Sequence, residues 1–155
     1  AAQAGGPAAR LAALAAVGLA TRGVPPPTAE PKAPPAPAGG IPADVSKRMT
    51  LADGLVASAL KAEPRSVELL LGAAYLRHYQ RRFAEEVTLY DAIRALNPPD
   101  SRYMNNLAWT LAVHLGKVRE GRAWIDEGLK RVGPHPELLD TKKVIDGMLA
   151  KSDGR

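Results

Sequence analysis

The side chains that most often carry chemistry in proteins are few and scattered in this sequence. The chain has no cysteine, which excludes disulfides, thiolate catalysis and cysteine-bound metals. Its three histidines, His78, His114 and His135, are isolated from one another, and none has partners at metal-ligand spacing. His78 and His114 fall near the ends of predicted helices, where a positive group suits the helix dipole. We therefore predict a capping role for these two histidines and no metal site.

The sequence also has no motif for nucleophilic catalysis or for phosphate binding by a loop. No serine lies in a nucleophile elbow, and no glycine-rich loop has the spacing that cradles a phosphate. We predict that the protein is not an enzyme and that it uses no cofactor.

One group of basic residues is dense enough to suggest a ligand. Arg77, Arg81 and Arg82 lie together, with Tyr75 and Tyr79 beside them, in a chain of net charge +5. Cations next to aromatic rings can contact phosphates and stack bases, so RNA or another polyanion is an alternative partner. The cluster spans about one helical turn and no equivalent row follows further along the chain, which favours a solvated turn. We expect no nucleic-acid partner.

Helices must position all of these side chains, because apolar residues recur at helical spacing from residue 43 onward. Ser66 is suited to cap one of these helices, Gly116 to end another, and Pro136 to occupy a first helical turn. The residue before a proline avoids the helical region, so Asn97-Pro98 marks a firm stop. The expected helices cover residues 44–62, 67–79, 83–96, 102–115, 118–132 and 137–149.

Residues 1–42 have a different composition, rich in alanine and proline. Residues 8–20 are compatible with a short helix that Gly23 and Pro25 would end, and the prolines that follow cannot continue it. We interpret 1–42 as a low-complexity arm and 43–155 as the helical domain. The longest apolar run, residues 11–20, is about half the roughly 20 residues that span a bilayer, so we predict no membrane span.

A period of 34 residues joins two of the predicted helices. Each position in the first has an apolar or proline counterpart in the second, apart from one glutamate: Met49, Ala52, Val56, Ala59 and Pro64 align with Phe83, Glu86, Tyr90, Ile93 and Pro98. This is the length of a tetratricopeptide (TPR) unit, a helix–turn–helix repeat. Glu86 and Ile93 stand where small residues are usual in that family.

The chain resembles a TPR protein in other positions too. Leu71-Gly72-x2-Tyr75 matches the latter part of the family's W-x2-L-G-x2-Y first helix, and Met104-x2-Leu107-Ala108-x2-Leu111 fills all four positions conservatively. Gly121, Ile125 and Gly128 fit the second helix. The resemblance implies an all-α solenoid of antiparallel helix pairs, about six helices in all. We expect a fragment of a longer bacterial TPR protein, with the cytoplasm as the favoured location.

In this family, ligands bind a concave groove lined by the first helix of each pair. Mapping that face onto the chain gives Leu69, Ala73, Leu76 and Arg77 from one unit, and Arg102, Asn105, Trp109 and Val113 from the next. Trp109 lies off its helix's apolar stripe, so it is a candidate anchor for a bound peptide; packing against a neighbouring helix is the other interpretation. The positions where some members hold a peptide carboxylate lack the necessary cations, so we predict no such clamp.

The sequence as a whole therefore predicts a protein–protein interaction scaffold that binds a peptide or helix. RNA or polyanion binding through Arg77, Arg81 and Arg82 is one alternative. A structural spacer, whose partners are other repeats of the same longer chain, is another. The partner's identity does not follow from these residues.

Overall fold

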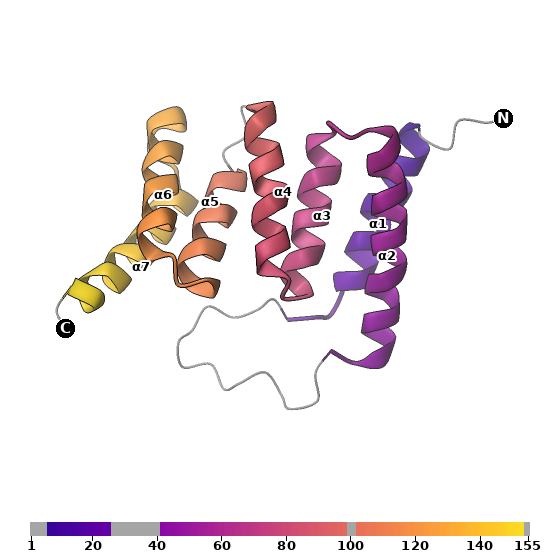
Figure 1. Ribbon diagram of the computed structural model, residues 1–155, viewed down its shortest axis with the longest axis horizontal. Helices are drawn as coiled ribbons and strands as arrows, with labels where there is room; N and C mark the ends of the chain where they lie inside the picture. Colours follow the sequence, from indigo (N-terminus) through magenta and orange to yellow (C-terminus); the bar gives the residue numbers. More distant parts are fainter. Residues whose placement is uncertain (1–5, 26–40, 99–101, 154–155) are drawn as a thin grey trace. The chain divides into compact units, whose positions relative to one another are not determined.

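The computed structural model describes residues 6–25, 41–98 and 102–153, and within these ranges the protein is all-α (Figure 1). Seven α-helices and one π-helical segment, η1, cover most of the described chain, and consecutive helices pack as antiparallel pairs. The elements are α1 (Pro7–Thr21), α2 (Ala43–Ala62), α3 (Val67–Tyr79), α4 (Phe83–Leu96), α5 (Arg102–Trp109), η1 (Thr110–His114), α6 (Val118–Val132) and α7 (Pro136–Asp153). The predicted all-α class is confirmed.

Local chemistry explains where these helices begin and end. The Ser66 side chain accepts a hydrogen bond from the backbone N–H of Leu69 and so caps α3, as predicted. Gly116 and Gly133 follow η1 and α6 with φ values of +68° and +75°, a conformation that glycine adopts without strain. Asn97, at φ +49°, ends α4 just before Pro98, and Pro136 begins α7. The predicted bounds of 83–96 and 118–132 are confirmed.

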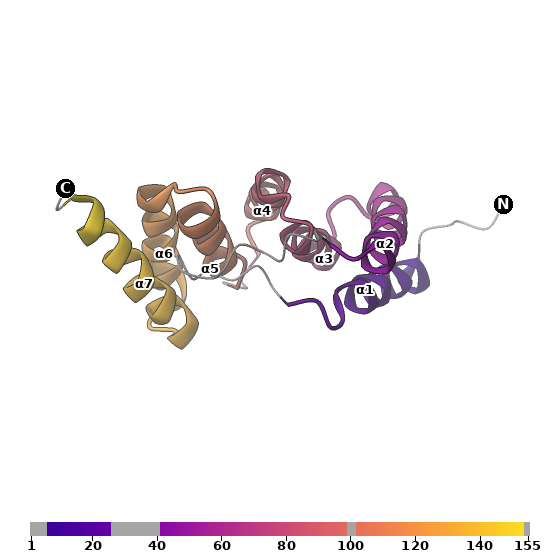
Figure 2. The ribbon, with the colours of Figure 1, turned by 90° about the horizontal axis from the view of Figure 1, so that it is seen from below.

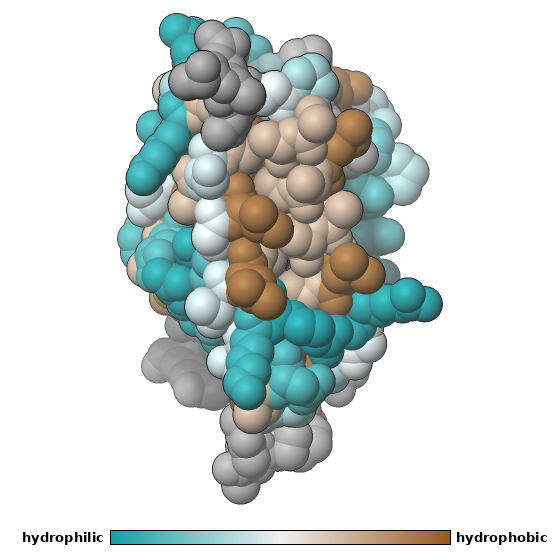
Figure 3. Space-filling view, turned by 90° about the vertical axis from the view of Figure 1, so that its right-hand side faces the viewer, coloured by the Kyte–Doolittle hydropathy of each residue, from teal (hydrophilic) through white to brown (hydrophobic). Residues whose placement is uncertain are grey.

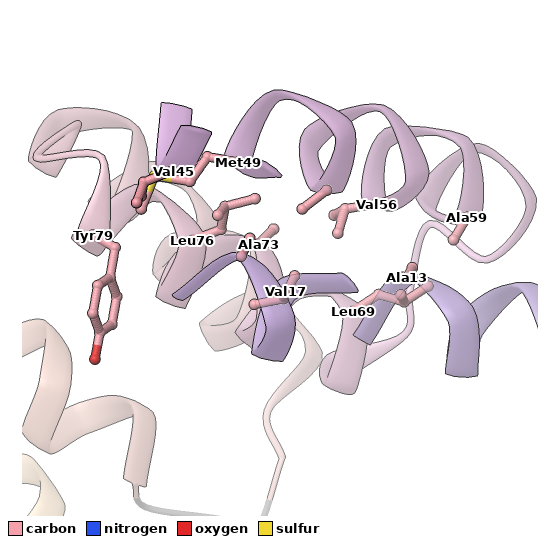
Figure 4. Packing of buried hydrophobic residues seen from close by; sticks show 12 residues of the cluster. Ala13, Val17, Val45, Met49, Val56, Ala59, Leu69, Ala73, Leu76 and Tyr79 are labelled. Carbon is pink, nitrogen blue, oxygen red and sulfur yellow. The ribbon is translucent and has the colours of Figure 1, made fainter. Parts of the chain in front are cut away.

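The chain forms two compact units, residues 1–92 and residues 93–155. In the first unit, α1 and α2 lie side by side and α3 packs against both of them (Figures 1 and 2). Their shared core includes Ala13 and Val17 from α1, Met49 from α2, and Leu69 and Leu76 from α3 (Figure 4). The short helix placed in the arm by sequence is thus a structural part of this unit, which is why the structure has one helix more than the six expected.

In the second unit, α6 packs against α5 and η1, and α7 packs against both α5 and α6. Ala108, Ala112, Ile125, Leu138 and Ile145 are among the fully enclosed residues of its core. Small residues allow close approach here: a Cβ placed on Gly121 would lie 2.6 Å from the Ala108 carbonyl oxygen. Among the described helices, none is both long and apolar enough to cross a membrane.

Candidate functional site

A groove of about 260 Å³ opens on the surface of the first unit, between α2, α3 and α4. Its apolar lining comes from all three helices: Val56, Ala57 and Leu60 from α2, Ala73 from α3, and Leu89 from α4. Asp53, Arg77, Glu85 and Thr88 supply its polar lining. We call this the α2–α4 groove. An apolar depression with a few fixed polar groups is the usual form of a binding site.

The polar end of the α2–α4 groove is held by a network centred on Arg77. This guanidinium contacts the Asp53 carboxylate, lies 3.2 Å from Glu85 Oε2, and donates a 2.8 Å hydrogen bond to Gln80 Oε1. Gln80 in turn donates from Nε2 to Asp53 Oδ2 at 2.8 Å. Because α2, α3 and α4 each supply a member, the network fixes the three helices relative to one another at this point.

Arg82 extends the same network across the turn between α3 and α4. It donates two hydrogen bonds of 2.6 Å to Glu85, and its Nη1 lies 3.7 Å from Asp53 Oδ2. These bonds from Arg82, with a smaller contribution from Arg77, lower the pKa of the Glu85 carboxyl. The turn itself includes Arg81 at φ +58°, which lets the backbone reverse direction within three residues.

A contact between the part-buried His78 and the buried Glu86 lies beside this network. His78 Nδ1 is 3.1 Å and 3.2 Å from the two carboxylate oxygens of Glu86, which is 1% exposed, and the Phe83 ring packs edge-on against His78 at 5.7 Å. The glutamate that departs from the TPR pattern therefore has a dedicated partner on the preceding helix. His78 lies in the last turn of α3, as predicted, and it also links α3 to α4.

The residues predicted to line a concave groove in the first unit have two different environments. Leu69 and Leu76 are fully buried, because α1 packs over the face of α3 that was predicted to line an open groove. Ala73 forms part of the floor of the α2–α4 groove, and Arg77 forms part of its polar end. Of the four predicted residues, only Ala73 and Arg77 therefore line the α2–α4 groove. The other residues of its lining were not predicted.

The remaining predicted residues belong to the second unit. Asn105, Trp109 and Val113 are each partly buried on α5 and η1, and Val113 packs against the core of that unit. The Asn105 side-chain oxygen is shielded from solvent and has no hydrogen-bond partner in the described structure. The Arg102 side chain lies outside the described residues. Trp109 is partly buried, and its role as a peptide anchor stays a prediction.

The three arginines proposed to hold a polyanion are not equally available. Arg77 and Arg82 both contact Asp53 and Glu85, so two acids balance their charge. Arg81 is exposed, and no ion pair is found for it among the described residues. The apparent basic cluster is mainly a neutral network that braces a turn.

The residues that give the α2–α4 groove its walls were not predicted from the sequence. Leu60 follows the buried Ala59, and Leu89 precedes the buried Tyr90, so each lies one position beside the buried stripe of its helix. The position of an apolar residue at the edge of such a stripe was the one feature of the sequence that could have indicated these wall residues. Asp53 gave no signal, because its partners are 24 to 29 residues away and meet it only through the fold.

The architecture defines an all-α protein built from antiparallel helix pairs. Comparison with protein families, with curated proteins and with solved structures found no match for this chain. Among the described residues, no group of three or more acidic, histidine or cysteine side chains is arranged to hold a metal ion.

Proposed function

We propose that this chain is a protein-interaction scaffold of TPR-like helix pairs, and that the α2–α4 groove binds a peptide segment. The observation that carries the proposal is an open apolar groove whose polar end is fixed by the Arg77 network. A bound segment would place an apolar side chain against Leu60 and Leu89, with its polar neighbours facing Asp53 and Glu85.

The buried pattern supports the TPR-like part of the proposal. Met49, Ala52, Val56 and Ala59 are all buried in α2, and the positions 34 residues later include buried Glu86, Tyr90 and Ile93 in α4. Helices α2 and α4 thus bury corresponding positions, and each follows an antiparallel partner helix. A repeat of helix pairs requires this arrangement.

Peptide selection can test the proposal because the groove and the Trp109 surface can be altered separately. A random peptide library displayed on phage would be selected on the wild-type chain, and selected peptides would be titrated by fluorescence anisotropy. We expect Leu60→Glu and Leu89→Glu, each of which puts a charge on the groove wall, to weaken binding, and Trp109→Ala to leave the affinity unchanged.

Two controls make the outcome decisive. Thr50→Glu alters an exposed position of α2 outside the groove lining and should bind as wild type does. Thermal melts would show that the groove variants remain folded. Loss of binding in Trp109→Ala with unchanged binding in both leucine variants would move the site to the second unit and overturn the proposal for the α2–α4 groove.

A further inference from the structure

Helix α1 is apolar on two opposite sides. Arg10 is its only charged residue, and this side chain forms an ion pair at 3.0 Å with Glu63, which directly follows α2. One side, with Ala13 and Val17, is buried against α2 and α3. The other side faces outward and carries Leu11 and Leu19, which are 67% and 59% exposed. A helix that is apolar all round is normally covered on all sides.

The outward side of α1 forms a continuous stripe at helical spacing, which we call the α1 face. Its exposed members are all apolar: Ala8, Leu11, Ala12, Ala15, Gly18 and Leu19. On α2, Leu51 and Leu55 are 70% and 47% exposed. Figure 3 views this side of the first unit and shows apolar atoms gathered in one strip, with hydrophilic atoms along its flanks and at its lower end. Contiguous exposed apolar surface with a polar rim marks an interaction site.

The shape of the α1 face favours a helix over a lipid surface. Leucines alternate with alanine and glycine, which gives ridges and shallow grooves of the kind that let a second helix pack closely. Helices that lie in a membrane interface usually carry tryptophan or phenylalanine on the apolar side, and the α1 face has no aromatic residue.

The charges at one end of the face are mostly positive. Arg22 and Lys47 are exposed there, and Arg48 donates a 2.9 Å hydrogen bond to the Leu19 carbonyl oxygen while lying 3.5 Å from Asp44. Three cations and one acid leave a positive rim beside the apolar stripe. A second copy of the chain would bring the same positive charge, whereas an acidic partner would complement it.

We propose that the α1 face docks an amphipathic helix that carries acidic residues beside its apolar stripe. The surface lies on α1 and the adjoining part of α2, and none of its residues lines the α2–α4 groove. The proposal is therefore independent of peptide binding in that groove.

Two synthetic helical peptides of about 18 residues, roughly 27 Å long, can test it. Both would carry the same leucine and alanine stripe, one with glutamate flanks and the other with lysine flanks, and each would be titrated into the full chain by fluorescence anisotropy. We expect the acidic peptide alone to bind. Leu19→Glu should weaken its affinity by about tenfold or more, since one leucine loses its buried contact.

Matched variants separate this surface from the others. Leu139→Glu, at a comparably exposed leucine of α7, and Leu89→Glu, in the α2–α4 groove, should leave binding of the acidic peptide unchanged. The paired change Arg22→Glu and Lys47→Glu should reverse the preference in favour of the lysine-flanked peptide. Leu19, Arg22 and Lys47 are exposed, so thermal melts of these variants should match wild type.

Three results would overturn the proposal. The first is no binding of the acidic peptide, or equal binding of both peptides. The second is a concentration-dependent dimer in light scattering that Leu19→Glu abolishes, which would make a second copy the occupant. The third is cosedimentation with vesicles of phosphatidylserine and phosphatidylcholine that Leu19→Glu abolishes, which would make the surface a lipid contact.

Discussion

Gly121 lies at a close approach between α6 and the preceding helical segments α5 and η1 in the second unit. A Cβ at this position would lie 2.6 Å from the Ala108 carbonyl oxygen and 2.9 Å from the Ala112 Cβ. The first of these contacts is with backbone, which cannot rotate away as a flexible side chain could. The absence of a side chain at residue 121 therefore sets how near the two helices can approach.

We expect Gly121→Ala to destabilise the second unit by about 1–3 kcal/mol, because an added methyl group forces the helices apart. Gly147→Ala is the matched control: residue 147 also lies within a helix of this unit, but a Cβ there meets nothing within 4 Å. That control should be stabilising by about 0.5–1 kcal/mol, since alanine is the better helix former. Urea denaturation followed by circular dichroism measures both, and equal effects would contradict the close approach.

Tyr79 gives a prediction at high pH. Burial, with a 3.0 Å hydrogen bond between its hydroxyl and that of Tyr75, raises the pKa of Tyr79 to about 12, from an ordinary value near 10. The folded state thus keeps the proton that the unfolded state loses. The associated stability is present below about pH 10 and is lost as pH rises through about 12.

A spectrophotometric titration can follow this ionisation through the phenolate absorbance. The wild-type chain should show a late ionisation step, to which Tyr103 also contributes because burial raises its pKa too, and Tyr79→Phe should reduce the amplitude of that step. Tyr79→Phe should also lose less stability than wild type between about pH 10 and 12. A wild-type titration in which all tyrosines ionise together while the protein remains folded would show that the environment of Tyr79 is wrongly described.

Single residues differed in how far sequence could predict them. Gly121 was placed at a small-residue position by pattern alone, and Ser66 was identified as a cap because its partner is three residues away. The Asp53 contacts could not be predicted, because nothing local distinguishes a carboxylate that meets three side chains of another helix and turn. Local chemistry is readable from sequence, whereas long-range pairing requires the fold.

At the scale of elements, α1 offers the sharpest test of the first unit. Ala13 is fully buried against α2 and α3, whereas Ala15, two residues later, is exposed on the α1 face. Ala13→Asp should destabilise the protein by several kcal/mol, because the carboxylate would be buried without a partner. Ala15→Asp should cost less than about 1 kcal/mol, the difference in helix propensity.

Thermal melts of these two variants distinguish between two possibilities: α1 is packed into the core of the first unit, or α1 is only loosely attached to its surface. If α1 only lay against the surface, both variants would melt close to wild type and the far-ultraviolet signal would fall by one helix at most. Equal and large losses from both would instead show that the α1 face is covered in the free protein. Either result would contradict the described packing.

Sequence reasoning found helix bounds well and helix partners poorly. Prolines, glycines and caps mark the ends of α3, α4 and α6 strongly. In α1, alanines occupy both the buried and the exposed side, so the pattern has little contrast and gives no sign of which side packs. With α1 assigned to an arm, Leu69 and Leu76 seemed free to line a groove, although the structure buries them beneath that helix.

For the whole molecule, the net charge of +5 is the property that a polyanion would meet first. Charge alone gives attraction without specificity, and such attraction falls steeply with salt. Specific recognition would need a surface where cations converge without acids. The arrangement around Arg77 and Arg82 is the opposite, because Asp53 and Glu85 lie between them.

We therefore expect the full chain to elute from a heparin column at modest salt and to show no measurable affinity for single-stranded RNA at physiological salt. Arg81→Ala and Lys143→Ala, both at exposed positions but in different units, should lower the eluting salt concentration by similar small amounts, because each removes one unit of charge. An RNA affinity that persists at physiological salt, and that Arg81→Ala abolishes while Lys143→Ala does not, would establish the polyanion alternative. In that event the α3–α4 turn, with its exposed arginine held in a positive-φ conformation, would be the contact, and the acids beside it would set the strength of binding.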